Sequence, residues 1–188
     1  MRTLLLVKHA PPEVVPSVPS EQWVLSEKGR ALCTPLADAL MPHAPAVIVS
    51  SEEPKASETA RLVAERLSIP WHTALGLHEH DRSNVPHLPS GEFISMMELF
   101  FRKPGESVLG RETADQARRR FDEAVRRVLD EHPAENVAVV SHGTVIALML
   151  DGKGIRTPFQ AWRGMGLPSY AALSLPDWEL SETVDRIG

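Results

Sequence analysis

The 188 residues are enough for one substantial hydrophobic core and few for two, and 43% hydrophobic with 24% charged residues is typical of a globular protein. A net charge of -5 argues against general binding to nucleic acids or anionic membranes, since both call for a basic face. The single cysteine, Cys33, cannot form an internal disulfide, and no apolar run approaches the length of a membrane span. We therefore expect a cytoplasmic protein whose partners are neither nucleic acid nor membrane.

Short apolar runs predict the strands. They are TLLLV at residues 3–7, AVIVS at 46–50 and VAVVS at 137–141. These runs are continuous rather than alternating, which is typical of strands buried on both faces of a parallel sheet covered by helices. Near the C-terminus, YAALSLPDWELSETV predicts a hairpin around Pro176 and Asp177.

Helical patterns fill the stretches between these strands. The first begins after Ser26, a plausible N-cap, and Pro35 is expected to kink or delay it. Apolar residues recur at helical spacing in three further stretches, around 56–67, 117–129 and 144–150. The order of elements predicts an α/β fold, a three-layer α/β/α sandwich with a mostly parallel central sheet. We treat residues 1–188 as a single domain.

The middle of the chain, residues 82–112, has a different composition. It is rich in proline, glycine, serine and aromatic residues, and its EFISMMELFF stretch predicts one helix. We expect this segment to act as a cap or lid over a site formed by the rest of the domain.

Reactive side chains follow the ends of the predicted strands. Lys8 and His9 end the first strand, Lys55 comes shortly after the second, and His142 directly follows the third. In an open parallel sheet, ligands bind outside the carboxyl ends of the strands. Helix N-termini at the same edge favour an anion. If the strands are neighbours, two histidines and two lysines converge on an anion site.

These motifs resemble those of the histidine phosphatase (phosphoglycerate mutase-like) superfamily. Its Arg-His-Gly motif corresponds to KHA, and its Ser-Ser, Arg-Ala and Thr-Ala elements correspond to SSEEPKASETA. Its Leu-x-Glu element is similar to LHEHD, and its Ser-His-Gly motif is present as SHG. The matches occur in the family's order and cover nearly the whole chain. The resemblance implies a phosphoglycerate mutase-like fold.

The resemblance also implies a phosphoric monoester hydrolase with a named site. His9 would attack phosphorus and form a phosphohistidine, and His142 with Lys8 and Lys55 would bind the phosphate. Glu79 would be the general acid, which calls for a pKa raised by burial or by the bound phosphate. Neither a metal nor another cofactor is required. The expected partner is a small phosphorylated substrate or a phosphoprotein, and the sequence gives no oligomeric state.

The chain departs from the family where Lys8 and Lys55 stand in place of arginine. Arginine binds two phosphate oxygens with a planar fork, whereas lysine offers a compact charge on a flexible stem. Loss of one well-aligned charged hydrogen bond costs about 1.5–3 kcal/mol. The alternative function is therefore a catalytically weakened family member that binds a phosphorylated ligand or partner without efficient turnover.

The stretch HEHD and the residues after it offer further candidates. On a strand, His78 and His80 would share a face and could both ligate zinc, although the sequence lacks the rest of a binuclear metallohydrolase pattern. We favour the phosphatase interpretation, with His80, Asp81 and Arg82 as candidate substrate contacts. Within the 82–112 segment, His87 and Arg102 are weaker candidates.

Overall fold

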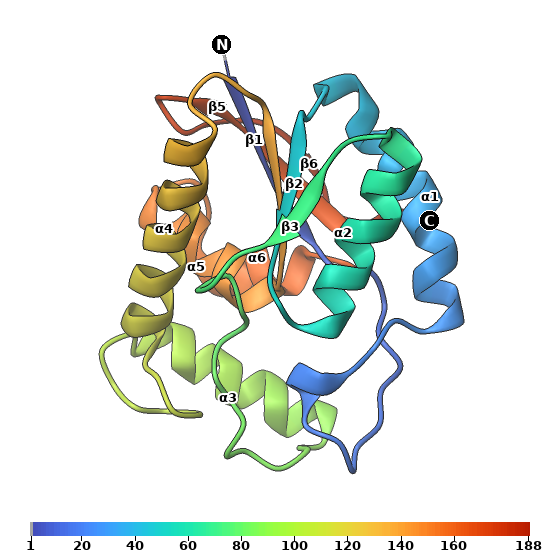
Figure 1. The fold of residues 1–188 in the computed structure, drawn as a ribbon. Coiled ribbons are helices and arrows are strands. Elements are labelled where there is room, and N and C mark those ends of the chain that lie inside the picture. Colours follow the sequence, from blue (N-terminus) through green and yellow to red (C-terminus); the bar gives the residue numbers. More distant parts are fainter. Residues whose placement is uncertain (1) are drawn as a thin grey trace.

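The computed structural model describes residues 2–188, and its centre is a six-stranded sheet (Figure 1). The strand order is β3-β2-β4-β1-β5-β6. Four neighbouring strands, β3, β2, β4 and β1, are parallel, while β5 runs antiparallel to β1 and β6 antiparallel to β5. The strands are β1 (Arg2–Lys8), β2 (Val47–Ser50), β3 (Trp71–Thr73), β4 (Val137–Ser141), β5 (Ser169–Leu175) and β6 (Glu179–Val184).

Helices cover both faces of this sheet. The pair α1 and α2 packs on one face and the pair α4 and α5 on the other, while α3 lies beyond the carboxyl ends of the parallel strands (Figure 1). The helices are α1 (Glu27–Leu40), α2 (Pro54–Leu67), α3 (Ser90–Arg102), α4 (Ala114–Glu131), α5 (Gly143–Gly152) and α6 (Pro158–Gly164), with short 3-10 helices η1 (Ser20–Gln22) and η2 (Met41–His43). The predicted three-layer α/β/α sandwich is confirmed.

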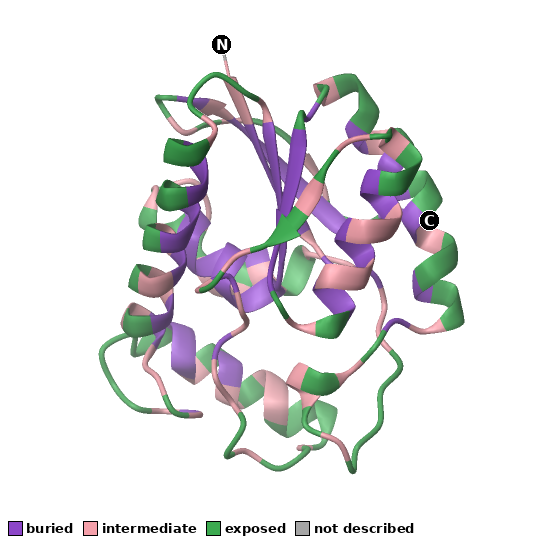
Figure 2. Cartoon of the chain, viewed as in Figure 1, coloured by how far each residue is buried: buried purple, intermediate pink, exposed green. Residues whose placement is uncertain are grey.

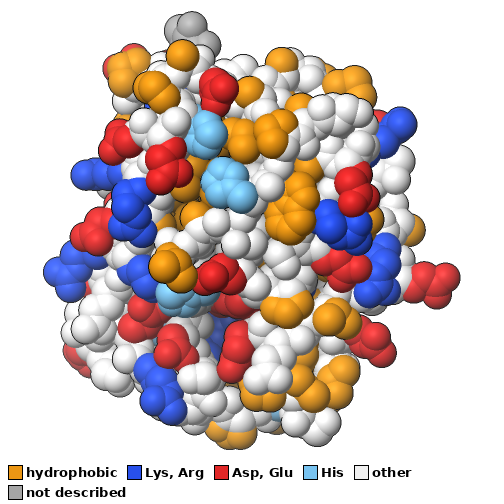
Figure 3. Space-filling model, in the orientation of Figure 1, with side chains coloured by type: hydrophobic (Ala, Val, Ile, Leu, Met, Phe, Trp, Pro, Cys, Tyr) orange, Lys and Arg blue, Asp and Glu red, His pale blue; other side chains and the backbone are white. Residues whose placement is uncertain are grey.

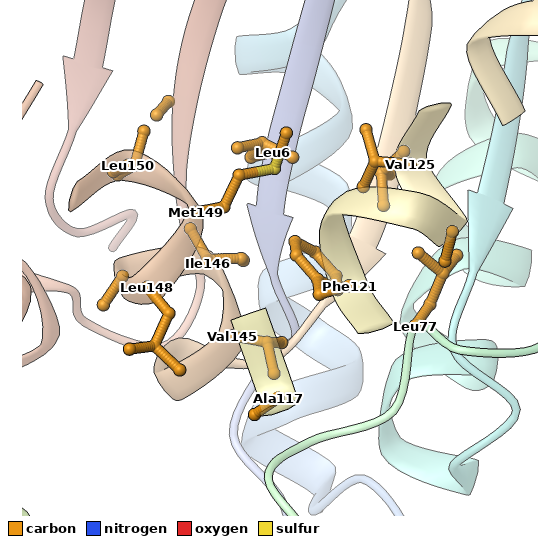
Figure 4. Close-up of a cluster of buried hydrophobic side chains, with 14 of the residues drawn as sticks. Leu6, Leu77, Ala117, Phe121, Val125, Val145, Ile146, Leu148, Met149 and Leu150 are labelled. Carbon is orange, nitrogen blue, oxygen red and sulfur yellow. The ribbon is translucent and has the colours of Figure 1, made fainter. Parts of the chain in front are cut away.

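The central strands are buried on both faces, which explains their continuous apolar runs. In β1, Leu5 and Val7 pack with α1 and α2, whereas Leu4 and Leu6 pack with α4 and α5. Figure 2 shows the inner strands in the colour of buried residues, between helices whose outer sides are exposed. Figure 4 shows part of the cluster that contains Leu4 and Leu6, in which Phe121 of α4 and Ile146 of α5 are also members.

Most predicted elements are present. Ser26 caps α1 by accepting a hydrogen bond from the Gly29 N–H at 3.0 Å, and Pro35 lies within α1 without delaying its start. The C-terminal hairpin is β5 and β6, and the helix of the middle segment is α3. The sequence did not predict β3, because only three residues pair and two of them are exposed, and it did not predict the short α6.

Every helix within residues 2–188 is too short or too polar to cross a lipid bilayer.

We predict that Phe121→Ala strongly destabilises the fold. Phe121 is fully buried among residues of α4, α5 and the sheet, so its truncation loses apolar burial and leaves a cavity. Urea unfolding should show a free energy of unfolding lower by about 3–5 kcal/mol. Leu75→Ala is the control, because Leu75 is 73% exposed. A loss for Phe121→Ala no larger than that for Leu75→Ala would contradict this account of the core.

Candidate active site

Strand pairing brings His9 and His142 together. Lys8 at the end of β1 pairs with Ser141 at the end of β4, so the next residue of each strand is a histidine at the same edge of the sheet. The His9 N–H donates to the Ser141 carbonyl at 3.0 Å. The two imidazole rings then lie edge to face, with centroids 5.1 Å apart. The predicted convergence of the strand ends therefore exists.

The imidazole of His9 is held in one tautomer. Its Nδ1 lies 2.8 Å from the Ala10 carbonyl oxygen, which can only accept, so Nδ1 carries the proton. This leaves Nε2 with a free lone pair. Burial, and after it the neighbouring His142 and Lys55, lower the pKa of His9 well below its ordinary value. His9 is therefore a neutral imidazole at pH 7, which is the nucleophilic form.

His142 has one nitrogen paired and one free. Its Nε2 lies 2.9 Å from Ser51 Oγ and 3.5 Å from Glu53 Oε1. Ser51 Oγ already accepts from the Glu53 N–H, so its own proton is available to His142 Nε2. In that tautomer Nδ1 carries a proton, and this buried atom finds no hydrogen-bond partner within residues 2–188. An unpaired buried donor is costly unless an acceptor such as a phosphate oxygen meets it.

Burial also controls the charge of His142. It lowers the pKa of His142 to about 3, although the charge of Glu79 acts in the opposite direction. Both histidines are therefore neutral at pH 7, and the positive charge of the site comes from lysine and arginine side chains.

The ammonium groups of Lys8 and Lys55 both reach the cluster of side chains around His9 and His142, and each is already hydrogen-bonded within the protein. Lys8 Nζ donates to the Met165 carbonyl at 2.9 Å. Lys55 Nζ donates to the Ser20 carbonyl at 2.6 Å and to Glu53 Oε2 at 2.5 Å. An ammonium group has three protons, so each lysine keeps at least one for a further acceptor.

Close packing around Lys8 affects its charge. Burial lowers the pKa of Lys8 from 10.5 to about 8, against the opposing effect of Glu79. A β-carbon on Gly143 would lie 3.0 Å from Lys8 Cε and 3.1 Å from Nζ, so glycine at the start of α5 leaves room for this side chain. Lys8 is thus a partly desolvated cation whose charge is lost just above neutral pH.

Glu79 is buried and ionised. Its Oε1 accepts from the His80 N–H at 2.8 Å, and its Oε2 accepts from the Thr144 N–H at 3.2 Å in the first turn of α5. Burial raises the pKa of Glu79, but Arg82, His142 and these N–H donors together outweigh it and lower the pKa to about 2. Burial alone therefore does not give Glu79 the raised pKa that a general acid calls for, because the paired charges and donors outweigh it.

The three candidate substrate contacts lie in different surroundings. His80 is buried against the Phe100 ring, with centroids 4.3 Å apart, and its Nε2 contacts the Glu112 carbonyl at 2.9 Å. Asp81 accepts two hydrogen bonds from Ser83. Among these three side chains, that of Arg82 reaches Glu79, with a guanidinium nitrogen 3.8 Å from Glu79 Oε2, whereas His80 contacts Glu79 through its backbone N–H.

The structure does not group His78 and His80 as metal ligands. Within residues 2–188, the side chains that could share an ion are His72, Glu131 and His132, whose ligand atoms lie within 4.8 Å of one another. They border the start of β2, at the opposite end of that strand from the candidate active site.

Glu53 is the site residue that sequence reasoning missed. Its carboxylate accepts from the Glu79 N–H at 2.8 Å, binds Lys55 and lies near His142. The motif SSEEPK did contain a signal, because a carboxylate two residues before Lys55 can reach its ammonium group. We did not expect a buried negative charge within an anion site.

Comparisons with known proteins agree with the expected family and fold. The family model of the histidine phosphatase superfamily (branch 1) matches residues 6–184. A search of curated proteins finds no match.

Solved structures share the fold at low sequence identity. A mycobacterial glucosyl-3-phosphoglycerate phosphatase, solved with VO3, is 21% identical, with a TM-score of 0.77 over 97% of this chain and 98% of that one. A phosphoserine phosphatase from Entamoeba histolytica, solved with 3-phosphoglyceric acid, is 15% identical, with a TM-score of 0.74 over 97% and 96%. An alpha-ribazole phosphatase from Shigella flexneri is 16% identical, with a TM-score of 0.73 over 99% and 98%.

We predict that Lys55→Met destabilises the protein by about 3 kcal/mol, because it leaves the Glu53 carboxylate buried without its partner. The double variant Glu53→Gln with Lys55→Met removes both charges and should recover a large part of this loss. Chemical denaturation of the wild type, the single variants and the double variant measures the coupling.

The control is the exposed ion pair of Lys103 and Glu106, whose side chains are 46% and 63% exposed. Lys103→Met should cost less than about 1 kcal/mol. Equal losses at Lys55 and Lys103 would show that the buried pair is not coupled as described.

Proposed function

The chain belongs to the histidine phosphatase superfamily, branch 1, and on that premise we propose that it hydrolyses a phosphate monoester through a phosphohistidine on His9. The observation that carries this proposal is the neutral His9 imidazole, with Nδ1–H held by the Ala10 carbonyl and Nε2 free. Nearby stand the cations Lys8 and Lys55 and the unpaired His142 Nδ1. This is the arrangement of a nucleophile beside donors for phosphate oxygens.

The first step transfers the phosphoryl group to the protein. His9 Nε2 forms the N–P bond while the ester P–O bond breaks, and the leaving oxygen takes a proton from Glu79. The charge on the phosphoryl oxygens is stabilised by the ammonium groups of Lys8 and Lys55 and by the His142 N–H. The Ala10 carbonyl accepts from Nδ1–H throughout, which stabilises the positive charge that the imidazole gains.

Glu79 needs a proton for this step, although it is ionised at rest. A phosphate anion beside the carboxylate raises its pKa, since two like charges in a buried site disfavour each other. The proton then comes from a monoanionic ester or from solvent. In the second step, water attacks phosphorus, Glu79 takes its proton, the N–P bond breaks, and His9 returns to the neutral form.

The proposed substrate is a small phosphorylated molecule. The similar structures include phosphatases named for glucosyl-3-phosphoglycerate, phosphoserine and alpha-ribazole, which supports a small-molecule phosphate ester over a phosphoprotein for this chain. We propose that the reaction takes place in the cytoplasm, and the single, buried Cys33 fits a reducing compartment.

A second candidate function is binding of a phosphorylated ligand without efficient turnover. The observation that favours it is the ion pair of Lys55 with Glu53, because a lysine that is already paired stabilises less of the charge that develops during phosphoryl transfer. The presence of a free nucleophile and a general acid together favours turnover, since binding alone needs neither.

We predict that wild-type protein hydrolyses an aryl phosphate and that His9→Ala abolishes this activity. Rapid quenching during turnover should trap one phosphoryl group on the protein, stable in alkali and labile in acid, as a phosphohistidine is. Peptide mass spectrometry should place it on His9.

The matched control is His72→Ala, because His72 is an exposed histidine outside the site. It should retain wild-type turnover and labelling. Phosphate or vanadate binding with no turnover by wild type would favour the binding function, and turnover that survives His9→Ala would refute His9 as the nucleophile.

We predict that kcat/KM falls as pH rises through about 8, because Lys8, with a pKa of about 8, loses its proton and its attraction for phosphate above that pH. Below that pH Lys8 is charged and supports the reaction. Lys8→Arg should move this fall to higher pH, since arginine stays protonated.

The control for the pH profile is Lys28→Arg, an exposed lysine of α1, which should leave the profile unchanged. An identical fall near pH 8 in Lys8→Arg would assign the titration to another group.

A further inference from the structure

A cavity of about 580 Å³ lies beside the candidate active site. It is bounded by residues 16–23, which include η1, and by residues 82–94, which lead into α3. Hydrophobic side chains gather over the lower part of the face in Figure 3, where Figure 1 places η1 and the segment before α3.

Two lining residues connect this cavity to the catalytic cluster. The carbonyl of Ser20 accepts from Lys55 Nζ at 2.6 Å, and the guanidinium of Arg82 lies 3.8 Å from Glu79 Oε2. The cavity therefore borders the catalytic cluster, where it can receive the organic part of an ester whose phosphoryl group is bound at His9.

The walls of the cavity combine apolar side chains, two of them aromatic, with polar ones that are mostly serines. The larger apolar side chains are Val18, Trp23, Val85, Leu88, Phe93 and Ile94. The Trp23 indole N–H donates to the Val15 and Val18 carbonyls at 3.1 Å and 2.9 Å, so this ring is fixed in place. Fixed aromatic walls offer a large apolar contact area to a ring of the ligand.

The cavity has almost no charge with which to receive a second anion. Among its described lining residues, Arg82 is the one lysine or arginine and Glu21 the one acidic residue. Arg82 already faces Glu79 and lies over the Phe93 ring at 5.1 Å. A carboxylate or second phosphate deeper in the cavity would lose its hydration without gaining a cationic partner, which is strongly unfavourable.

Resting on the phosphatase function proposed above, we propose that the substrate is a phosphate monoester whose organic part is uncharged and carries a ring. Trp23 and Phe93 contact the ring. Arg82, at the junction of cavity and cluster, binds a phosphoryl oxygen. Its Nη1 already lies 3.4 Å from Thr144 Oγ1, so the guanidinium binds this oxygen through Nη2, the nitrogen that faces Glu79.

The test compares two esters that differ by one carboxylate, phenyl phosphate and 4-carboxyphenyl phosphate. We expect kcat/KM to be at least about tenfold higher for phenyl phosphate, because the unpaired carboxylate must be desolvated. Equal or faster turnover of the carboxylate ester would overturn the proposed substrate class.

A matched pair of variants tests whether the preference for phenyl phosphate arises in the cavity. His87→Lys adds a cation at an exposed position of the cavity lining and should lower the preference for phenyl phosphate by about threefold or more. Leu75→Lys adds the same charge at an exposed position outside the cavity and should leave the preference unchanged. An unchanged preference in His87→Lys would count against the cavity as the binding place.

A binding measurement separates this proposal from the phosphatase function. Benzylphosphonate and 4-(phosphonomethyl)benzoate cannot be hydrolysed at the P–C bond by this chemistry, and calorimetry gives their affinities. Binding of benzylphosphonate about tenfold tighter than that of 4-(phosphonomethyl)benzoate supports the ligand class, whether or not any ester is turned over. Absence of turnover would refute only the phosphatase function. Equal or weaker binding of benzylphosphonate, or binding of neither compound, overturns the ligand class.

Discussion

Parallel pairing of β4 with β1 on one side and with β2 on the other is the constraint on which the site depends. The register of Lys8 with Ser141 places His9 beside His142, and the register of Ser50 with Val140 brings the start of the SSEE motif to the same edge. Three segments far apart in the sequence therefore meet with no long loop between them. The apolar residues that hold this register are buried on both faces, so the position of His9 depends on core packing.

Burial of this edge decides the charge of each group. It keeps both histidines neutral, brings the pKa of Lys8 to about 8, and leaves Glu79 ionised only because Arg82, His142 and N–H donors surround it. The charge of Lys55 is compensated by its ion pair with Glu53. The site thus combines the cations Lys8, Lys55 and Arg82 with the carboxylates of Glu53 and Glu79. The phosphate ester that we propose as substrate would add negative charge beside Glu79.

The sequence predicted the central strands, the cap of α1, α3 and the convergence of His9, Lys8, Lys55 and His142, because continuous apolar runs and strand ends are local signals. It could not predict β3, whose pairing depends on a neighbouring strand rather than on an apolar run. It also missed the low pKa of Glu79 and the pairing of Glu53 with Lys55. Both depend on distances between side chains from separate segments, which no spacing in the sequence reveals.

The central claim is that His9 is a neutral imidazole with its proton on Nδ1 and a free Nε2. Nitrogen-15 NMR of the imidazole, assigned with His9→Ala, measures both properties in the whole protein. The account predicts a protonated Nδ1, an unprotonated Nε2, and no titration as pH falls through 6.5, the ordinary pKa of histidine. A proton on Nε2, or titration of His9 near pH 6.5, would contradict it.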